Sequence, residues 1–264
     1  MSFPNIVYGS SGDQFTTSST KIGSLPLGTE MVIPGGRWFV HARASATALV
    51  AGKLYQQNIG IQGTDTAYIK DLAVAASAAI GAQTVQVTCG ATTAVTKNQF
   101  TDGFLFVNDA TGEGYSYMIK ENTAAAAGST CTLTLYENET IQVALAAGTS
   151  EVGIRENPYY SLTLTTADTV TVGPVAGIAP VAVAANYYCW IQTDGVAAAF
   201  TDGTLIVGEP VVAGTAAAGS LTVFSPAAAD TAGARVIKET TVLGYCLNVA
   251  ASTEYSLVKL AIPK

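Results

Sequence analysis

The segment NYYCWIQTDGVAAAFTDGTLIVGEPVVAG, residues 186–214, shows the most pronounced β pattern in the chain. It divides into two short strand-like runs that end in a glycine-containing hairpin, followed by a third run, GEPVV, at 208–212. Tyr187, Tyr188 and Trp190 add a large apolar area, since each aromatic side chain can bury about 150–250 Å². We therefore predict that this segment forms the core hairpin of a β-barrel.

Similar patterns continue on both sides of this segment. Polar and apolar residues alternate at 84–89, at 130–136 and at 255–262, which is typical of half-buried strands. Short strands separated by Gly-rich turns at intervals of about ten residues predict an all-β fold, either a barrel or a sandwich. Residues 71–80 are ambiguous, because their Ala-rich composition is also compatible with a short helix that Gly81 would end.

Glycines mark several predicted turns. Gly35 and Gly36 follow a proline between two strand-like runs, which predicts a hairpin because glycine adopts positive φ without strain. The motif FTDG occurs twice, and its glycines, Gly103 and Gly203, are predicted to lie in turns. Either an internal duplication or two hairpins with the same turn chemistry would produce this echo.

Composition and turn signals divide the chain into three parts. Residues 1–23 are polar, rich in Ser, Thr and Gly, and carry single aromatics. They are predicted to form either an extended arm that becomes ordered on docking or a mobile terminus. The predicted β-barrel body comprises residues 24–59 and 158–264, and residues 60–157 are predicted to form an inserted second β domain.

Charged residues are scarce in this chain. They make up 12% of the sequence, although 49% of the residues are hydrophobic, and the formal charge is −7. Solvated surfaces usually carry many charges, so this composition favours a surface partly covered by another protein. No basic stripe is present, and nucleic-acid binding is therefore not expected. The acidic balance suits either a basic protein partner or simple solubility.

Membrane insertion is not expected. Two stretches without charge, residues 72–96 and 169–193, are long enough to suggest a membrane span. The first contains Gln and Thr and the second contains several Gly and Pro, so neither predicts a transmembrane helix. The first residues, MSFPNIVYGSSGDQF, lack the basic and apolar regions of a secretory signal peptide, and none is expected.

The residues that usually carry catalysis or bind metals are too few to form a recognisable site. His41 is the only histidine, and Asp102 and Asp202 lie in the FTDG turns, where aspartate is common. The cysteines lie far apart without a CxxC pair, and buried free thiols are predicted for Cys89, Cys131, Cys189 and Cys246. We therefore predict no catalytic residues, no cofactor, no metal site and no enzymatic activity.

Several short motifs in both halves of the chain resemble those of capsid decoration (cement) proteins of tailed bacteriophages, particularly uncharacterised virion proteins of marine and cyanobacterial phages. The motifs are WIQTDG at 190–195, TDG at 201–203, GEPVV at 208–212, LGY at 243–245, YSLVKL at 255–260, YGSSGDQ at 8–14 and LPLGT at 25–29. The resemblance covers most of the chain, but it rests on turn glycines and strand alternation.

This resemblance implies a structural virion protein without enzymatic activity. Such a protein is made in the host cytoplasm, binds the outer surface of the major capsid protein shell, stabilises it, and often forms a homotrimer. The residues then expected to contact the capsid are Phe3, Tyr8, Phe15, Tyr187, Tyr188 and Pro210. The alternative is a carbohydrate-binding or head- or tail-fibre β module for host attachment, in which the Tyr and Trp side chains stack on sugars.

Overall fold

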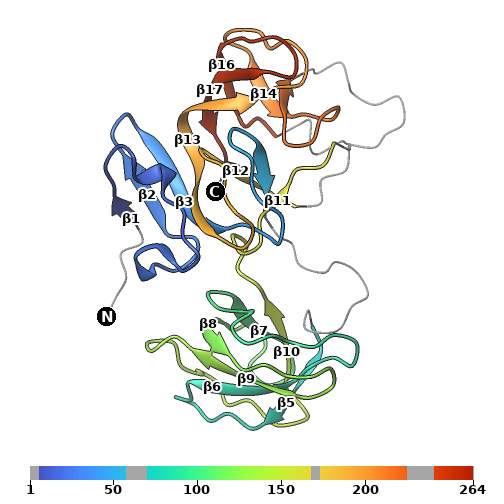
Figure 1. The fold of residues 1–264 in the computed structure, drawn as a ribbon. Helices are drawn as coiled ribbons and strands as arrows, with labels where there is room; N and C mark the ends of the chain where they lie inside the picture. Colours follow the sequence, from blue (N-terminus) through green and yellow to red (C-terminus); the bar gives the residue numbers. More distant parts are fainter. Residues whose placement is uncertain (1–5, 58–69, 168–172, 225–240, 264) are drawn as a thin grey trace, which may run out of the picture. The chain divides into compact units, whose positions relative to one another are not determined.

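The computed structural model describes residues 6–57, 70–167, 173–224 and 241–263, and nearly all of its regular structure is β-strand (Figure 1). The chain forms two compact units: unit 1 contains residues 1–59 and 158–264, and unit 2 contains residues 60–157. The prediction of an all-β fold is confirmed.

The described residues include two short 3-10 helices, η1 (Asp13–Phe15) and η2 (Ile22–Ser24). No helix in these ranges is long and apolar enough to cross a membrane. The ambiguous segment at 71–80 contains a strand, β5 (Leu72–Ala76), and no helix. Its alternate residues Leu72 and Val74 are buried in the core of unit 2, so tertiary packing overrides its helix-compatible composition.

Unit 1 is built around the long strand β13 (Tyr188–Phe200) in an 11-stranded sheet. The first half of β13 pairs antiparallel with β3 (Arg37–Arg43), and the second half pairs antiparallel with β17 (Tyr255–Ala261). The sheet follows the order β1-β2-β3-β13-β17-β16-β14-β15.

The other strands of this path are β1 (Ile6–Tyr8), β2 (Glu30–Ile33), β16 (Gly244–Asn248), β14 (Pro210–Ala213) and β15 (Leu221–Val223). Three short strands branch from the path, and they are β4 (Leu54–Gln56), β11 (Thr163–Leu164) and β12 (Val175–Ile178).

Two short strands ending in a glycine-containing hairpin were predicted within 186–214, whereas residues 188–200 form one strand of 13 residues and residues 204–207 form none. The register of β13 shifts between Gln192 and Asp194, at the point where the pairing partner changes from β3 to β17. Gly195 lies against the turn between β2 and β3, and a Cβ at this position would come within 2.7 Å of the Gly36 carbonyl oxygen. The TDG at 193–195 therefore continues the strand through a bulge.

The N-terminal segment is part of unit 1 from residue 6 onward. Strand β1 pairs in parallel with β2, and the Gly9 N–H donates to the Val32 carbonyl at 2.9 Å. Ser18 and Tyr188 exchange two backbone hydrogen bonds of 3.0 and 2.7 Å. Residues 6–9 and Ser18 thus pair with strands of their own unit, and the extended arm at 1–23 stays a prediction.

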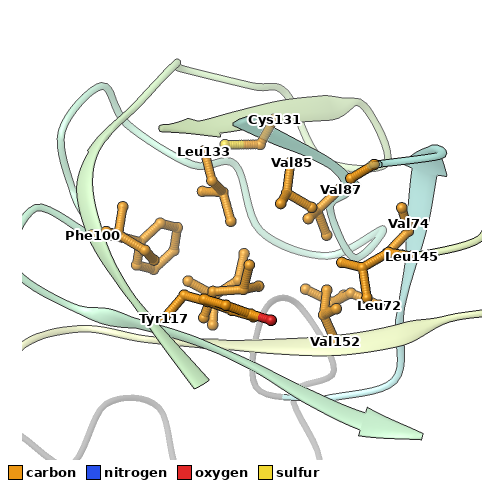
Figure 2. Close-up of a cluster of buried hydrophobic side chains, with 14 of the residues drawn as sticks. Leu72, Val74, Val85, Val87, Phe100, Tyr117, Cys131, Leu133, Leu145 and Val152 are labelled. Carbon is orange, nitrogen blue, oxygen red and sulfur yellow. The ribbon is translucent and has the colours of Figure 1, made fainter. Parts of the chain in front are cut away.

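Unit 2 is a closed barrel in which six strands follow the order β10-β5-β6-β9-β8-β7. The strands not yet defined are β6 (Thr84–Thr88), β7 (Phe104–Asp109), β8 (Ser116–Asn122), β9 (Thr130–Leu135) and β10 (Glu151–Arg155). The alternation predicted for β6 and β9 is confirmed, since Val85, Val87 and Leu133 all point into the core (Figure 2). Closure leaves the barrel without a free edge strand.

The predicted turn glycines differ in their backbone conformations. Gly35 and Gly36 both have positive φ, 89° and 67°, between β2 and β3. Gly203 has φ 78°, but in the first FTDG it is Asp102 that has the positive φ, 61°. Gly103 is instead packed so closely that a Cβ would lie 2.2 Å from the Arg155 carbonyl oxygen. The two FTDG segments therefore share a sequence and not a conformation.

Gly244 is the glycine of β16 on which the pairing with β17 depends, and it yields a stability prediction. Its φ is 154°, and a Cβ would lie 2.1 Å from the carbonyl oxygen of Lys259. We expect Gly244→Ala to lower the free energy of unfolding several times more than Gly203→Ala. Gly203 also has a positive φ, but the space around it is open. Gly203→Ala, the control, should lower the free energy of unfolding by about 1 kcal/mol. Urea denaturation measures both, and equal losses would contradict the packing argument.

Candidate functional site

The outward side of β13, β17 and β16 is unusually apolar. Cross-strand pairing aligns Ala198 with Leu257 and Phe200 with Tyr255. Lys259 lies between Val196 on β13 and Tyr245 on β16, and Asp194, which pairs with Ala261, is a second charged residue on the same side of β13. We call this surface the apolar face, and its members are Val196, Ala198, Phe200, Tyr245, Tyr255 and Leu257.

The apolar face is exposed although its strands are well packed on the other side. Val196, Leu257, Tyr245 and Tyr255 retain between 40% and 49% of their accessible surface. The alternate residues of the same strands, such as Val258 and Leu260, are completely buried. Half-exposed strands usually carry polar residues on the solvent side, so these exposed apolar side chains form a candidate contact surface.

A groove of about 510 Å³ adjoins the apolar face and shares Val196, Ala198 and Tyr255 with it. Its other walls are formed by Phe15 of η1, by the loop at 50–52 and by the chain around Pro180. All of these residues belong to unit 1. The groove and the face together form a continuous apolar region at one side of the sheet.

The loop at 50–52 fixes one wall of the groove. The Val50 N–H donates to the buried hydroxyl of Tyr55 at 2.6 Å, and the Phe200 N–H donates to the Gly52 carbonyl at 2.7 Å. Gly52 has φ 70°, and a Cβ there would lie 2.6 Å from the ring of Tyr255. The absence of a side chain at Gly52 therefore lets the Tyr255 ring pack directly on the loop backbone.

The residues that were predicted to contact the capsid lie at different places on unit 1. Phe15 is 54% exposed and lines the groove, whereas Tyr8 is 86% exposed on β1, at one end of the sheet path. Tyr187 is exposed and Tyr188 is half-buried at the start of β13, beside Ser18. Pro210 is half-buried at the start of β14. Phe3 lies outside the described residues.

The aromatic run of β13 divides between surface and core. Trp190 is 3% exposed and packs with Met31, Ile33 and Phe39. Its ring centroid also lies 5.3 Å from that of His41. Trp190 is therefore a core residue, and a surface platform for sugars would have to use the tyrosines alone.

Arg43 organises the exposed end of this run. Its guanidinium carbon lies 4.7 Å from the ring centroid of Tyr160 and 5.7 Å from that of Tyr188. The Arg43 Nε–H donates to the Asn186 carbonyl at 3.1 Å, and a terminal N–H donates to the Asn186 side-chain oxygen at 3.3 Å. These contacts hold the cation over the two aromatic rings.

His41 and Asp102 have structural roles. The buried His41 donates from Nδ1 to the Pro26 carbonyl at 3.1 Å, since a carbonyl oxygen only accepts. In unit 2 the buried Asp102 carboxylate accepts a hydrogen bond from the Tyr136 hydroxyl, while the Asn157 side chain donates to the Asp102 carbonyl at 2.8 Å. Burial, together with this bond, raises the pKa of Tyr136. Among the described residues, no His, Cys, Asp and Glu side chains gather into a metal-binding group.

All four cysteines are buried and free, as predicted from the strand alternation and spacing. Burial raises the pKa of the Cys89 thiol to about 11 and that of Cys189 to about 12. Because the thiolate is the reactive form, these thiols are protected at neutral pH both by burial and by protonation.

We expect almost no labelling of the folded protein by N-ethylmaleimide at pH 7.5, and rapid labelling of four thiols per chain in 6 M guanidinium chloride, as counted by intact mass. Because burial raises the pKa of the Cys89 thiol, its contribution to the free energy of unfolding is fully present below the pKa of an unfolded cysteine. That contribution is lost as the pH rises towards 11. Rapid labelling of Cys189 in the folded protein would contradict its burial.

Sequence reasoning missed most of the residues around the groove. The alternation at 255–262 identified the buried residues Val258 and Leu260, but the other phase of the same strand contains Tyr255 and Leu257, which are also apolar. A strand with apolar residues in both phases is typical of a strand buried on both faces, and the sequence at 255–262 has this pattern. The alanines of β13 gave no comparable signal, because alanine is common on both sides of a sheet.

Comparisons of the chain with protein-family models, with curated proteins and with solved structures found no match.

Proposed function

We propose that the protein is a non-enzymatic structural component of a virion that binds the outer surface of a major capsid protein shell and stabilises it. The apolar face of unit 1 makes the contact in this proposal. The resemblance of the sequence motifs to capsid decoration proteins supplies the partner. The observation that carries the proposal is the exposure of Val196, Leu257, Tyr245 and Tyr255 on adjacent strands.

The energetics of apolar burial support such a docking surface. Burying apolar area yields about 25 cal/mol per Å², so each 100 Å² that a partner covers contributes about 2.5 kcal/mol before the costs of association. Tyr245 and Tyr255 belong to a residue type that is enriched at protein interfaces. Lys259 lies between Val196 and Tyr245 on this face and offers a positive group to an acidic residue of the partner.

Reconstitution tests the proposal. Purified protein is added to shells assembled from the major capsid protein alone, and the shells are sedimented and imaged by electron cryomicroscopy. We expect saturable binding, added density on the outer surface, and shells that resist a higher temperature than bare shells. Absence of binding to both unexpanded and expanded shells would overturn the proposal. The same images and analytical ultracentrifugation test the homotrimer.

A carbohydrate-binding or fibre module for host attachment is the second candidate, and the Arg43 cluster favours it. Tyr187 is 38% exposed next to Tyr188 and Tyr160, which flank the Arg43 guanidinium. Exposed aromatic rings combined with hydrogen-bonding side chains suit sugar rings. A glycan array on which clear binding is lost in Tyr187→Ala and kept in Leu257→Glu would favour this candidate over capsid docking.

A further inference from the structure

Two buried glutamines give the apolar groove a specific hydrogen-bonding character. Gln14 and Gln192 each retain only 4% of their accessible surface and both line the groove. The Gln14 side-chain oxygen accepts from the Gly12 N–H at 2.8 Å. The Gln192 side-chain nitrogen donates to the carbonyls of Asp194 at 3.1 Å and Val196 at 2.9 Å.

These hydrogen bonds determine which side-chain amide atom of each glutamine remains available to a ligand. Both acceptors of Gln192 Nε2 are carbonyls, so the nitrogen must face them and Oε1 is left as a free acceptor. In Gln14 the oxygen is used and Nε2 is left as a free donor. Neither remaining atom has a partner among the described residues, and neither is sealed from solvent. The groove thus offers one donor and one acceptor from side chains that are held in place.

A peptide group matches this pair because it carries one acceptor, its C=O, and one donor, its N–H. A desolvated polar group without a partner is costly, so an apolar ligand without hydrogen-bonding groups would leave both amides unsatisfied. The walls formed by Phe15, Val50 and Tyr255 suit an apolar side chain next to that peptide group.

Arg37 supplies the charge at the groove. It is the one charged residue among the described residues that line the groove, and its guanidinium has no ion pair or hydrogen bond within the described ranges. A guanidinium binds a carboxylate through two parallel N–H donors. The groove therefore favours an acidic group close to the apolar side chain.

We propose that this groove binds an extended peptide segment of a partner protein, in which an apolar residue is followed or preceded by an acidic residue. The apolar side chain lies between Phe15 and Tyr255, a peptide group bonds Gln14 Nε2 and Gln192 Oε1, and the carboxylate pairs with Arg37. The groove continues into the apolar face, and this continuity favours a segment that belongs to a larger protein surface. The inference rests on the proposed docking function for its biological partner.

A random seven-residue peptide library displayed on a carrier tests this chemistry without any capsid protein. Selection on the full-length protein should enrich peptides with an aromatic or large aliphatic residue adjacent to Asp or Glu. Fluorescence polarisation with labelled synthetic copies should then show binding that Ala198→Trp, which fills the groove, reduces at least about tenfold. Ala73→Trp is the matched control, since Ala73 is an exposed strand residue of unit 2.

The role of Arg37 has its own readout. Arg37→Gln should weaken the acidic peptide about tenfold or more while leaving its Asp→Asn or Glu→Gln counterpart unchanged. Enrichment of basic peptides, binding unaffected by Ala198→Trp, or no enrichment would overturn the inference. Saturable binding of decanoate in the groove without peptide selection would assign it to small acids instead. Shell binding without peptide binding would remove only this inference, and peptide binding without shell binding would remove only the capsid proposal.

Discussion

Replacing Phe100 by alanine is expected to unfold the barrel of unit 2 in much lower urea while leaving unit 1 folded. The Phe100 side chain is completely buried in the barrel core (Figure 2), and its backbone N–H donates to the Asn122 side-chain oxygen at 2.8 Å. The substitution therefore removes the ring and leaves the backbone anchor. Loss of a buried phenylalanine ring costs about 3–5 kcal/mol, a large part of the stability of a domain of this size.

The two tryptophans make this experiment selective. Trp38 and Trp190 both belong to unit 1, so tryptophan fluorescence reports on that unit, while far-UV circular dichroism reports on both units. In Phe100→Ala we expect an early transition by circular dichroism and an unchanged fluorescence midpoint. Phe104→Ala is the matched control, because Phe104 is 38% exposed on β7 of the same barrel, and it should change the midpoint little. An equal shift of both signals in Phe100→Ala would contradict the independence of the units.

The fold class was predictable because strand alternation is a local property of the sequence. Val85, Val87 and Leu133 alternate with polar residues, and this pattern alone predicts buried and exposed faces. A change of composition near residue 60 was visible for the same reason. The partners of each strand depend on contacts between distant residues, and the local pattern carries no information about them.

The misjudged length of β13 has a specific physical cause. Thr193, Asp194 and Gly195 have turn chemistry in isolation, but the register shift at this point lets one continuous strand change partner from β3 to β17. Gly195 is required by the close approach of Gly36 and not by a hairpin. The pairing of β1 with β2 was equally hidden, because a three-residue strand among Ser and Gly has too little pattern to detect.

The candidate site was predicted only in part. Phe15 was selected as an isolated apolar residue in a polar segment, and it lines the groove. Gln14 and Gln192 escaped notice because an amide side chain acquires a role only when burial and its fixed hydrogen bonds leave one atom free. Phe3 lies outside the described residues, so its role stays a prediction.

The contribution of the apolar face to binding is the second large effect that we expect. Leu257 lies on the central strand of the face, next to Ala198, and is 40% exposed, so a polar replacement should be tolerated by the fold. Leu257→Glu removes apolar contact and places a charge at the centre of the interface. If Leu257 is a hot spot of the interface, its loss costs about 2 kcal/mol or more, which corresponds to a loss of affinity of about thirtyfold.

The most direct measurement is therefore the affinity of Leu257→Glu for reconstituted capsid shells, determined by co-sedimentation at a series of protein concentrations. Ala73→Glu introduces the same charge at an exposed strand position of unit 2 and serves as the control. Circular dichroism and thermal unfolding confirm that both variants are folded. Docking through the apolar face predicts affinity at least about thirtyfold weaker for Leu257→Glu and nearly unchanged for Ala73→Glu. Wild-type affinity in a folded Leu257→Glu variant would contradict it.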